Sequence, residues 1–391
     1  MNRVELLAPA GDLEKLKIAI LYGADAVFIG GKKFSLRAKA SNFTLEDIKE
    51  GCDFAHKFNK KIHVTVNIYP HELDLEGLKE YLIALDKCGV DAIIVSSLYI
   101  MKVALSLNLK FEVHVSTQLS SNNSKTIEFF KDFGVHRVVL GRECTIDEIK
   151  EIKRKSPLDI EVFIHGGLCS SYSGRCTLSN NLCNRDANRG GCAQVCRFSF
   201  DTNESKEFTM ALKDMNMAEY IGDLIDIGVT SLKVEGRMRS LYYLATVIGT
   251  YREIIDRYYD KTLTPRVMSV LQERLDRVAN RETSTHYFMK EADWTDQYYT
   301  GRSEVSNQDY LGQVIEYKDG LVKFYERNYF EIGDEIELFT PKGEHIEFKL
   351  SKLYNEDMEE IDVARHPDNI YYLYLDTDIE IPEYSMIKMG G

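Results

Sequence analysis

The most constraining feature of this chain is an alternation of short apolar runs with helical segments. Between the runs lie segments of helical periodicity, such as Leu75–Cys88 and Ile146–Lys155. Alternating strands and helices imply parallel pairing with right-handed crossovers, and about eight such units predict a TIM-barrel-like (β/α) domain. Nine runs are present, so one must lie outside the barrel, and Phe208–Leu212 or an end strand is expected there. The runs are Val4–Ala8, Ala26–Gly30, Ile62–Asn67, Ala92–Ser96, Phe111–Ser116, Arg137–Gly141, Ile160–His165, Phe208–Leu212 and Ser231–Glu235.

Four similar phrases support a repeated unit: YGADAVFIGG, CGVDAIIVSS, FGVHRVVLGR and IGVTSLKVEG. Each places a glycine just before a predicted strand, where it suits the left-handed C-cap of the preceding helix. A doubly wound open sheet is the alternative. It is less favoured because LLAPAGDLE, at the first predicted strand, lacks the GxGxxG pattern of dinucleotide-binding folds.

The pattern changes near the C-terminus. Residues 1–279 form the predicted α/β domain, 280–309 read as a linker of weak periodicity, and 310–391 alternate with period 2. We therefore expect a small C-terminal β-barrel domain. The net charge of −13 is concentrated there: residues 301–391 hold 9 basic and 21 acidic side chains, whereas residues 1–300 hold 40 and 41. The N-terminal domain is thus close to neutral and could carry a basic face.

The cysteines point to a metal or redox site. The N-terminus lacks the pattern of a signal peptide, and the most apolar window, Asp91–Leu107, is too short and polar for a membrane span. A cytoplasmic location without membrane insertion is expected, and that compartment keeps thiols reduced. Clustered cysteines are then metal ligands or redox groups rather than disulfides. Cys52, Cys88 and Cys144 are read as apolar fillers, and Cys183 as a non-ligating thiol.

The strongest local signal is a set of four cysteines, spaced C-x6-C-x15-C-x3-C: Cys169, Cys176, Cys192 and Cys196. They lie in a predicted insertion, residues 166–200, that follows the run Ile160–His165. This insertion should hang over the C-terminal rim of the barrel, where barrel enzymes place their chemistry. Uneven spacing of four thiolates favours an iron–sulfur cluster; zinc, which usually shows two close pairs, and free or redox thiols remain alternatives.

The residues around these cysteines resemble a family signature. The stretch EVFIHGGLCSSYSGRCTLS, Glu161–Ser179, closely resembles that of the collagenase-like peptidase family U32, with Gly167 at a position where the family usually has Ser or Ala. LAPAG, HVSTQ, RE, RGGCAQVCR and KVEGR are further matching phrases. The resemblance covers roughly residues 1–260, and longer members carry a C-terminal β domain.

The resemblance implies more than a peptidase. The chain has no HExxH or GxSxG motif, so the peptidase name fits the residues poorly. Several members are oxygen-independent hydroxylases that bind a 4Fe-4S cluster through four cysteines and use prephenate as hydroxyl source. Their branches act on the wobble uridine of tRNA, on a cytidine of ribosomal RNA, or on quinone precursors with a paralogous subunit. The long form resembles the tRNA branch most, with a collagenase-like peptidase and the other two hydroxylases as alternatives.

Two groups of side chains are candidates for binding substrate. Prephenate is a dicarboxylate, so cations near predicted strand ends are candidates for holding it. Either these cations bind the donor, or they form barrel salt bridges. His165, just before the cysteines, is either a proton donor or, as we favour, a hydrogen-bond partner of a cluster sulfide. The candidate cations are Arg142, Arg237, Lys213 and His114.

For RNA, the candidates are Arg175, Arg185, Arg189 and Arg197 in the cysteine segment, with Tyr172 and Phe198 interleaved. Such a pattern suits phosphate contacts and base stacking. The alternative is that these arginines support the surroundings of the cluster. The acidic β domain is expected to face away from RNA or to bind a protein.

Overall fold

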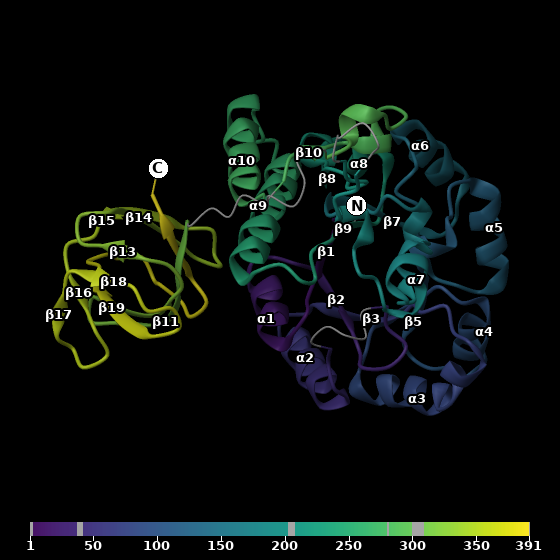
Figure 1. Cartoon of the computed structure of the whole chain (residues 1–391), viewed down its shortest axis with the longest axis horizontal. Coiled ribbons are helices and arrows are strands. Elements are labelled where there is room, and N and C mark those ends of the chain that lie inside the picture. Colours follow the sequence, from purple (N-terminus) through teal and green to yellow (C-terminus); the bar gives the residue numbers. More distant parts are fainter. Residues whose placement is uncertain (1–2, 37–41, 202–207, 280, 299–308, 391) are drawn as a thin grey trace.

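The computed structural model describes residues 3–36, 42–201, 208–279, 281–298 and 309–390. They form an α/β barrel and a β domain that lies beside it (Figure 1). No helix of the described residues is both long and apolar enough to cross a membrane.

The barrel consists, within the described residues, of eight parallel strands. Each of β1 to β7 pairs with the next, and β9 closes the ring by pairing with both β7 and β1. The predicted TIM-barrel-like fold is therefore confirmed. The strands are β1 (Glu5–Pro9), β2 (Ala26–Gly30), β3 (Lys61–Val66), β4 (Ala92–Val95), β5 (Glu112–Val115), β6 (Arg137–Val139), β7 (Asp159–Gly166) and β9 (Ser231–Val234).

The ninth predicted run, Phe208–Leu212, lies outside the barrel, as expected, but it is not a strand of the sheet. Its two ends form only isolated bridges, to Phe200 and Gln297. The nearby strand is β8 (Asp214–Asn216), which pairs antiparallel to the end of β7, and β10 (Thr283–Ser284) pairs with β8. The closed ring leaves no place for another parallel strand, so these short strands extend β7 above the mouth.

Helices surround the barrel (Figure 1). Three of the four glycines of the repeated phrases have the predicted role: Gly89, Gly134 and Gly228 cap α3, α5 and α8 with φ of +87°, +94° and +85°, whereas the C-cap of α1 is Tyr22, just before Gly23. The helices are α1 (Leu13–Leu21), α2 (Leu45–Lys57), α3 (Leu78–Cys88), α4 (Leu98–Ser106), α5 (Ser124–Phe133), α6 (Ile146–Lys155), α7 (Leu178–Cys183), α8 (Ile221–Ile227), α9 (Leu241–Tyr259) and α10 (Pro265–Val278).

Much of the predicted linker 280–309 is structured. Residues 281–298 hold β10 and two short 3-10 helices, η7 (His286–Phe288) and η8 (Trp294–Asp296). His286 and Phe288 are buried, and Phe288 belongs to the barrel's hydrophobic core. The structure of this segment could not be predicted from periodicity, because short turns anchored by single buried side chains have no regular repeat. Residues 299–308 lie outside the described part of the chain.

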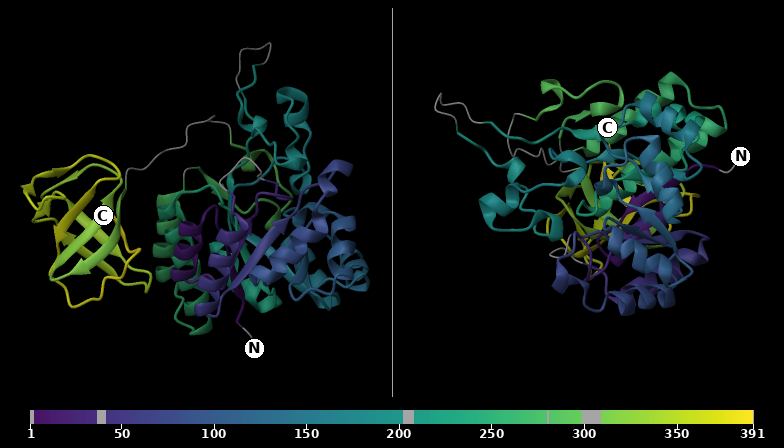
Figure 2. Two further views of the ribbon diagram at one scale, coloured as in Figure 1. Left: turned by 90° about the horizontal axis from the view of Figure 1, so that it is seen from below. Right: turned by 90° about the vertical axis from the view of Figure 1, so that its right-hand side faces the viewer.

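The predicted all-β C-terminal domain is confirmed. Its main sheet is antiparallel, with the order β15-β14-β20-β11-β12-β19-β16-β17, and it curves into a half-barrel, with β13 and β18 paired separately (Figure 2). Its strands are β11 (Tyr310–Lys318), β12 (Leu321–Glu326), β13 (Phe330–Glu331), β14 (Glu335–Phe339), β15 (His345–Lys349), β16 (Leu353–Tyr354), β17 (Glu360–Ile361), β18 (Val363–Ala364), β19 (Ile370–Tyr374) and β20 (Met386–Met389).

The β domain packs against the barrel through aromatic side chains. Tyr242 of α9 stacks on Tyr310 with ring centroids 5.2 Å apart, and the Tyr22 hydroxyl donates to the Tyr384 carbonyl over 2.9 Å. Phe339 and Met386 belong to the same buried cluster as the barrel core. The two domains therefore share a continuous hydrophobic contact.

Candidate functional site

A cavity of about 800 Å³ opens at the C-terminal mouth of the barrel. Figure 1 looks into this mouth, and in Figure 2 (left) the cysteine-bearing insertion projects from the barrel end opposite the N-terminus. Phe28, Ile94 and Phe163 from the strands line the cavity, and its wall comes from the insertion and from residues 286–296. The sequence therefore indicated the correct end of the barrel for the site.

Three of the four predicted cysteine ligands line this cavity: Cys169, Cys192 and Cys196. Burial is the main cause that raises the pKa of Cys196, and the neighbouring Cys169 thiol is the second, as expected for sulfurs close to each other. Cys176 lies in the same insertion, where its backbone amide donates to Asn188 Oδ1 over 3.3 Å. All eight cysteines are free thiols.

These sulfurs fit a large group better than a single ion. Tetrahedral zinc with Zn–S bonds of about 2.3 Å requires sulfurs about 3.8 Å apart. Among the described residues, however, no three cysteine sulfurs lie within 4.8 Å of one another. A four-iron cluster holds its thiolates farther apart because each binds a different iron. Four thiolates are the donor set that a cubane cluster takes, so Cys169, Cys176, Cys192 and Cys196 are the residues that could hold one.

Contacts from distant strands hold the insertion in place. Glu143, after β6, accepts from the Ser173 hydroxyl over 2.9 Å. Arg175 donates to the Gln118 carbonyl over 2.7 Å, and Arg189 makes two bonds to Asp74, of 2.8 and 2.6 Å. The insertion is therefore clamped to the loops after β3, β5 and β6.

These contacts bear on the four predicted RNA-binding arginines. Arg175 and Arg189 are engaged in the clamps just described, and Arg185 donates to the Cys192 carbonyl over 3.4 Å. Arg197 donates to Gln194 and lines the cavity, where burial and then the nearby charge of Arg281 lower the pKa of its guanidinium. The structure thus gives all four arginines intramolecular contacts.

Two of the predicted donor-binding cations reach the cavity, Arg142 and Arg237. Arg142 lies 3.9 Å above the Phe163 ring and donates to the Gly167 carbonyl over 2.8 Å. Buried Arg237 donates to Ser35 and Asn42 over 3.3 and 2.7 Å. Glu143, the neighbour of Arg142 in sequence, binds Ser173.

The other three predicted site residues are not among the cavity-lining residues described. Lys213 pairs with Glu282 over 2.8 Å on the outside. His114 is fully buried inside the barrel below the cavity, because it is the third residue of β5 and not its end. His165 contacts the Tyr251 hydroxyl of α9 through its Nδ1 atom at 3.1 Å. Burial and the Arg239 charge lower the pKa of His165 to about 3, so its ring is neutral.

The sequence interpretation missed two cations of the cavity, Lys233 and Arg239. Both lie in or next to the KVEGR phrase, which was noted only for Arg237. Arg239 pairs with Asp214 over 2.6 Å, and the Lys233 ammonium lies 4.4 Å from the Phe28 ring centre. The alternation of side chains along a strand could have indicated Lys233. It is two residues from Glu235, which also lines the cavity, so the two face the same side.

Beneath the cavity lies a buried charged cluster. Glu161, fully buried, accepts from Lys233 over 2.8 Å and from Arg137 over 3.2 Å. Burial opposes ionisation of Glu161, but the charges of Lys233 and Arg137 outweigh it and lower the pKa of this carboxyl. His63, His114 and Glu161 have ligand atoms within 4.8 Å of one another. Two cations already occupy Glu161, so a divalent metal there would meet strong repulsion.

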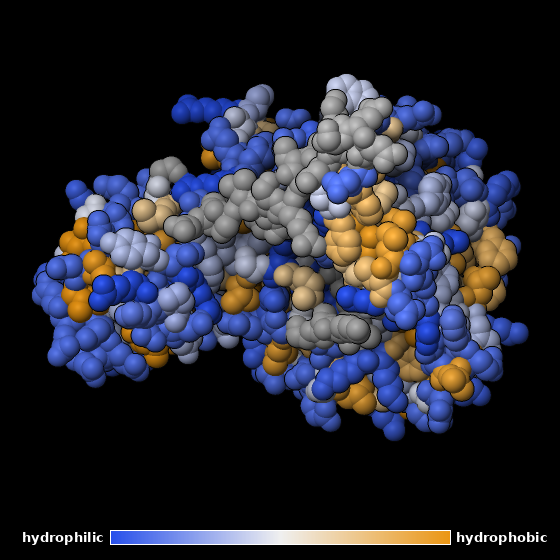
Figure 3. Space-filling view, viewed as in Figure 1, coloured by the Kyte–Doolittle hydropathy of each residue, from blue (hydrophilic) through white to orange (hydrophobic). Residues whose placement is uncertain are grey.

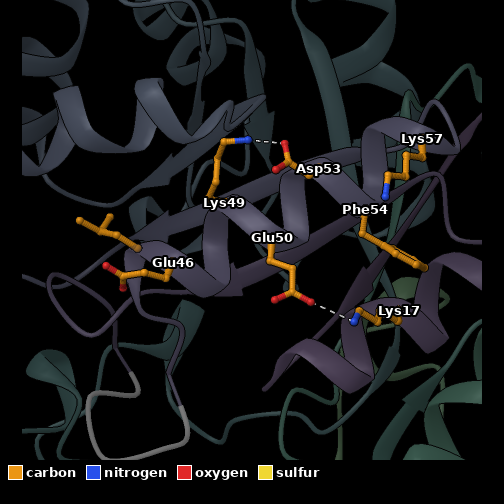
Figure 4. Close-up of a pocket in the computed structure, with 8 residues that line it drawn as sticks. Lys17, Glu46, Lys49, Glu50, Asp53, Phe54 and Lys57 are labelled. Carbon is orange, nitrogen blue, oxygen red and sulfur yellow. Dashed lines mark hydrogen bonds and ion pairs between the residues drawn. The ribbon is translucent and has the colours of Figure 1, made fainter.

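A second depression lies on the outside of the barrel, over α1 and α2 (Figure 4). Four of its six charged side chains pair with each other: Lys49 with Asp53, and Lys17 with Glu50 over 3.0 Å. None of the predicted site residues lines it. The barrel mouth is therefore the candidate site.

Comparison with known proteins agrees with this arrangement. The model of peptidase family U32 matches residues 11–297, and that of its C-terminal domain matches residues 306–388. The tRNA hydroxylation protein P1 of Bacillus subtilis is 43% identical, over 97% of this chain and 93% of that protein. A collagenase of Porphyromonas gingivalis is 32% identical, covering 87% of both chains. The 23S rRNA 5-hydroxycytidine C2501 synthase of Escherichia coli is 35% identical, over 75% of this chain and 44% of that protein. The chain therefore belongs to peptidase family U32.

Proposed function

We propose that this chain is an RNA-modifying hydroxylase that acts on the wobble uridine of tRNA, without oxygen, with prephenate as hydroxyl source. A 4Fe-4S cluster would be held by Cys169, Cys176, Cys192 and Cys196. The observation that carries the proposal is one cavity lined both by cysteines and by cations: Cys169, Cys192 and Cys196 on one side, and Arg142, Arg197, Arg237, Arg239 and Lys233 around it. A cluster supplies electron transfer when bound.

The cations fit an anionic co-substrate beside the cysteines. Guanidinium groups bind carboxylates with two parallel hydrogen bonds, and prephenate carries two carboxylates. Arg237 is 4% exposed, and Ser35 and Asn42 fix its direction, so its position is set before substrate arrives. Arg142 rests on Phe163 in the same way. Preorganised charges of this kind favour binding without a cost of reorganisation.

Relatives support tRNA as the substrate class. Similar proteins from Bacillus subtilis and Escherichia coli, the latter 30% identical over 97% of this chain, are named tRNA hydroxylation proteins. Hydroxylation of ribosomal RNA, or of a quinone precursor together with a paralogous subunit, is the alternative within the same chemistry. A nearly neutral barrel domain is compatible with RNA, and the surplus of acid lies in the β domain.

A peptidase mechanism has less support from the geometry. A cysteine nucleophile needs a histidine within hydrogen-bond reach to activate it. Cys169 Sγ contacts Ser171 Oγ at 2.8 Å, and His165, its nearest candidate in sequence, is turned to Tyr251. Among the described residues, Cys169 and His165 therefore do not form the contact that a cysteine peptidase would need between them.

The test is the modification of wobble uridine in cells lacking this chain and its siblings. We expect loss of the hydroxylated nucleoside by mass spectrometry, rescue by the wild type and by Cys183→Ser, and no rescue by Cys169→Ser or Cys196→Ser. Prephenate starvation should copy the defect. Anaerobically purified protein should contain about four iron and four sulfide per chain. Full wobble modification without this protein, or stoichiometric zinc without iron, would overturn the proposal.

A further inference from the structure

Three aromatic side chains lie at or next to the mouth of the cavity, and two of them are exposed. Tyr172, from the insertion, lines it and is 59% exposed; Tyr287, from η7, lines it half-buried. Trp294 in η8 is 74% exposed, and its neighbours Asp293 and Asp296 line the cavity. We call Tyr172, Tyr287 and Trp294 the aromatic rim. Large aromatic side chains left in solvent together at a cavity mouth mark a binding surface.

Hydrogen bonds to neighbouring residues hold the rim. The Tyr172 hydroxyl accepts from Asn122 Nδ2 over 2.7 Å. Behind Trp294, buried Asp296 accepts from Ser284 over 2.6 Å, and His286 contacts the Lys213 carbonyl at 2.8 Å. The backbone that carries these rings is therefore fixed, while their faces stay in solvent. Figure 3, which looks onto this mouth, also shows apolar side chains gathering there among hydrophilic ones.

The chemistry of the rim and of the cavity selects the ligand. Aromatic rings stack on any nucleobase, because every base presents a π face, and this favours unpaired bases over paired ones. Within the cavity, Arg142, Arg197 and Arg237 supply positive charge that complements phosphate. Proteins that modify a base must take it out of its stack, and a rim of rings can replace the lost neighbours.

We infer that the aromatic rim, and Trp294 above all, stacks on unpaired bases that flank the target nucleotide of a single-stranded RNA loop. The inference rests on the proposed function for its RNA substrate. It adds the residues that hold the loop, and it assigns a binding role to a segment that the sequence indicated only as linker. The target nucleotide enters the cavity, and its neighbours remain on the rim.

Trp294 is the one tryptophan of the chain, so the tryptophan fluorescence of the protein reports on this residue alone. Adding a 17-nucleotide anticodon stem-loop RNA to the cluster-loaded full-length protein should change the tryptophan emission, saturating with the binding curve. Trp294→Ala should weaken binding by about 5–150-fold, the equivalent of about 1–3 kcal/mol of lost stacking per base. Trp294→Phe should keep most of the affinity. Phe58→Ala, an exposed aromatic after α2 at the opposite end of the barrel, is the matched control and should bind normally.

Circular dichroism of each variant separates lost stacking from lost folding. Full RNA binding with unchanged tryptophan emission, together with normal affinity of Trp294→Ala, would overturn the inference. Equal binding of a fully paired duplex would overturn it too. If RNA binds the rim but no nucleoside is hydroxylated, the inference stands and the proposed function fails. If Trp294→Ala hydroxylates RNA normally at low RNA concentration, the proposed function stands and the inference fails.

Discussion

At the residue scale, Glu161 connects the barrel core to the site. It accepts from Lys233, which lines the cavity, and from Arg137, which also binds Glu5 of β1. The carboxylate therefore balances two buried cations and fixes the direction of one cavity residue. The first residue of the family signature therefore acts in the barrel core and not beside the cysteines.

Glu161→Gln should destabilise the fold strongly, because it leaves Lys233 and Arg137 without their shared counter-charge. Breaking a buried ion pair by removing one partner costs about 3–5 kcal/mol. Denaturant unfolding of the anaerobic protein measures this. Glu151→Gln, which removes an exposed carboxylate paired on α6, is the control and should change stability little, because exposed ion pairs contribute little. Equal stability of the two variants would contradict the role of the cluster.

A second buried carboxylate, Glu326 of β12, predicts a pH effect in the β domain. It is fully buried, and among the described residues neither of its carboxylate oxygens has a hydrogen-bond partner. Burial, and then the charge of Asp368, raise the pKa of Glu326 to about 7. The folded state thus holds a proton that the unfolded chain releases near pH 4.5, so stability falls as pH rises from about 4.5 to 7. Glu326→Gln should remove this dependence: its melting temperature, relative to wild type, should be higher at pH 8 than at pH 5.

At the element scale, the insertion is positioned by clamps rather than by its own regular structure. Its helices are short, and Arg189 ties it to Asp74 in η1 (Glu72–Leu75) by two bonds. Such bidentate pairs add geometric specificity to the charge interaction. The cysteines therefore depend on loops after distant strands for their arrangement.

Arg189→Gln and Asp74→Asn should have the same effect, because each breaks one clamp. Amide hydrogen exchange in residues 185–197 should become faster in both, with the double variant no worse than either single one. The comparison also tests the earlier interpretation of Arg189 as a phosphate contact. In that case Arg189→Gln alone would weaken RNA binding and reduce its salt dependence, while Asp74→Asn would not.

At the scale of the whole molecule, the β domain is attached by a hydrophobic contact that continues the barrel core. The centre of the Phe339 ring lies 5.8 Å from that of Tyr22, the residue after α1, and 6.2 Å from that of Tyr242 in α9. Arg277 of α10 adds a bond to the Met389 carbonyl over 3.0 Å. The acidic domain is therefore held beside α1 and α9, on the outside of the barrel.

Phe339→Ala should loosen this attachment. Truncating a buried phenylalanine costs about 3–5 kcal/mol, and here the loss falls mainly on the contact between domains. Small-angle X-ray scattering should show a larger radius of gyration. Phe330→Ala, whose ring is fully buried in the separate core of the β domain, should lower the stability of that domain without separating the two. An unchanged radius of gyration for Phe339→Ala would contradict the prediction.

Period and spacing in the sequence were enough to predict the alternating units, the glycine caps, the β domain and the end of the barrel that carries the site. These features depend on local periodicity and on the rule that parallel strands end at one rim. The tertiary structure alone decided which charged residues face the cavity. Arg189 pairs with a residue 115 positions away, and Arg137 with one 132 positions away, so neither role could be read from neighbours in sequence. His114 lies inside the barrel and not at a strand end, because a side chain's surroundings depend on the ring of strands around it, and no single strand contains that information.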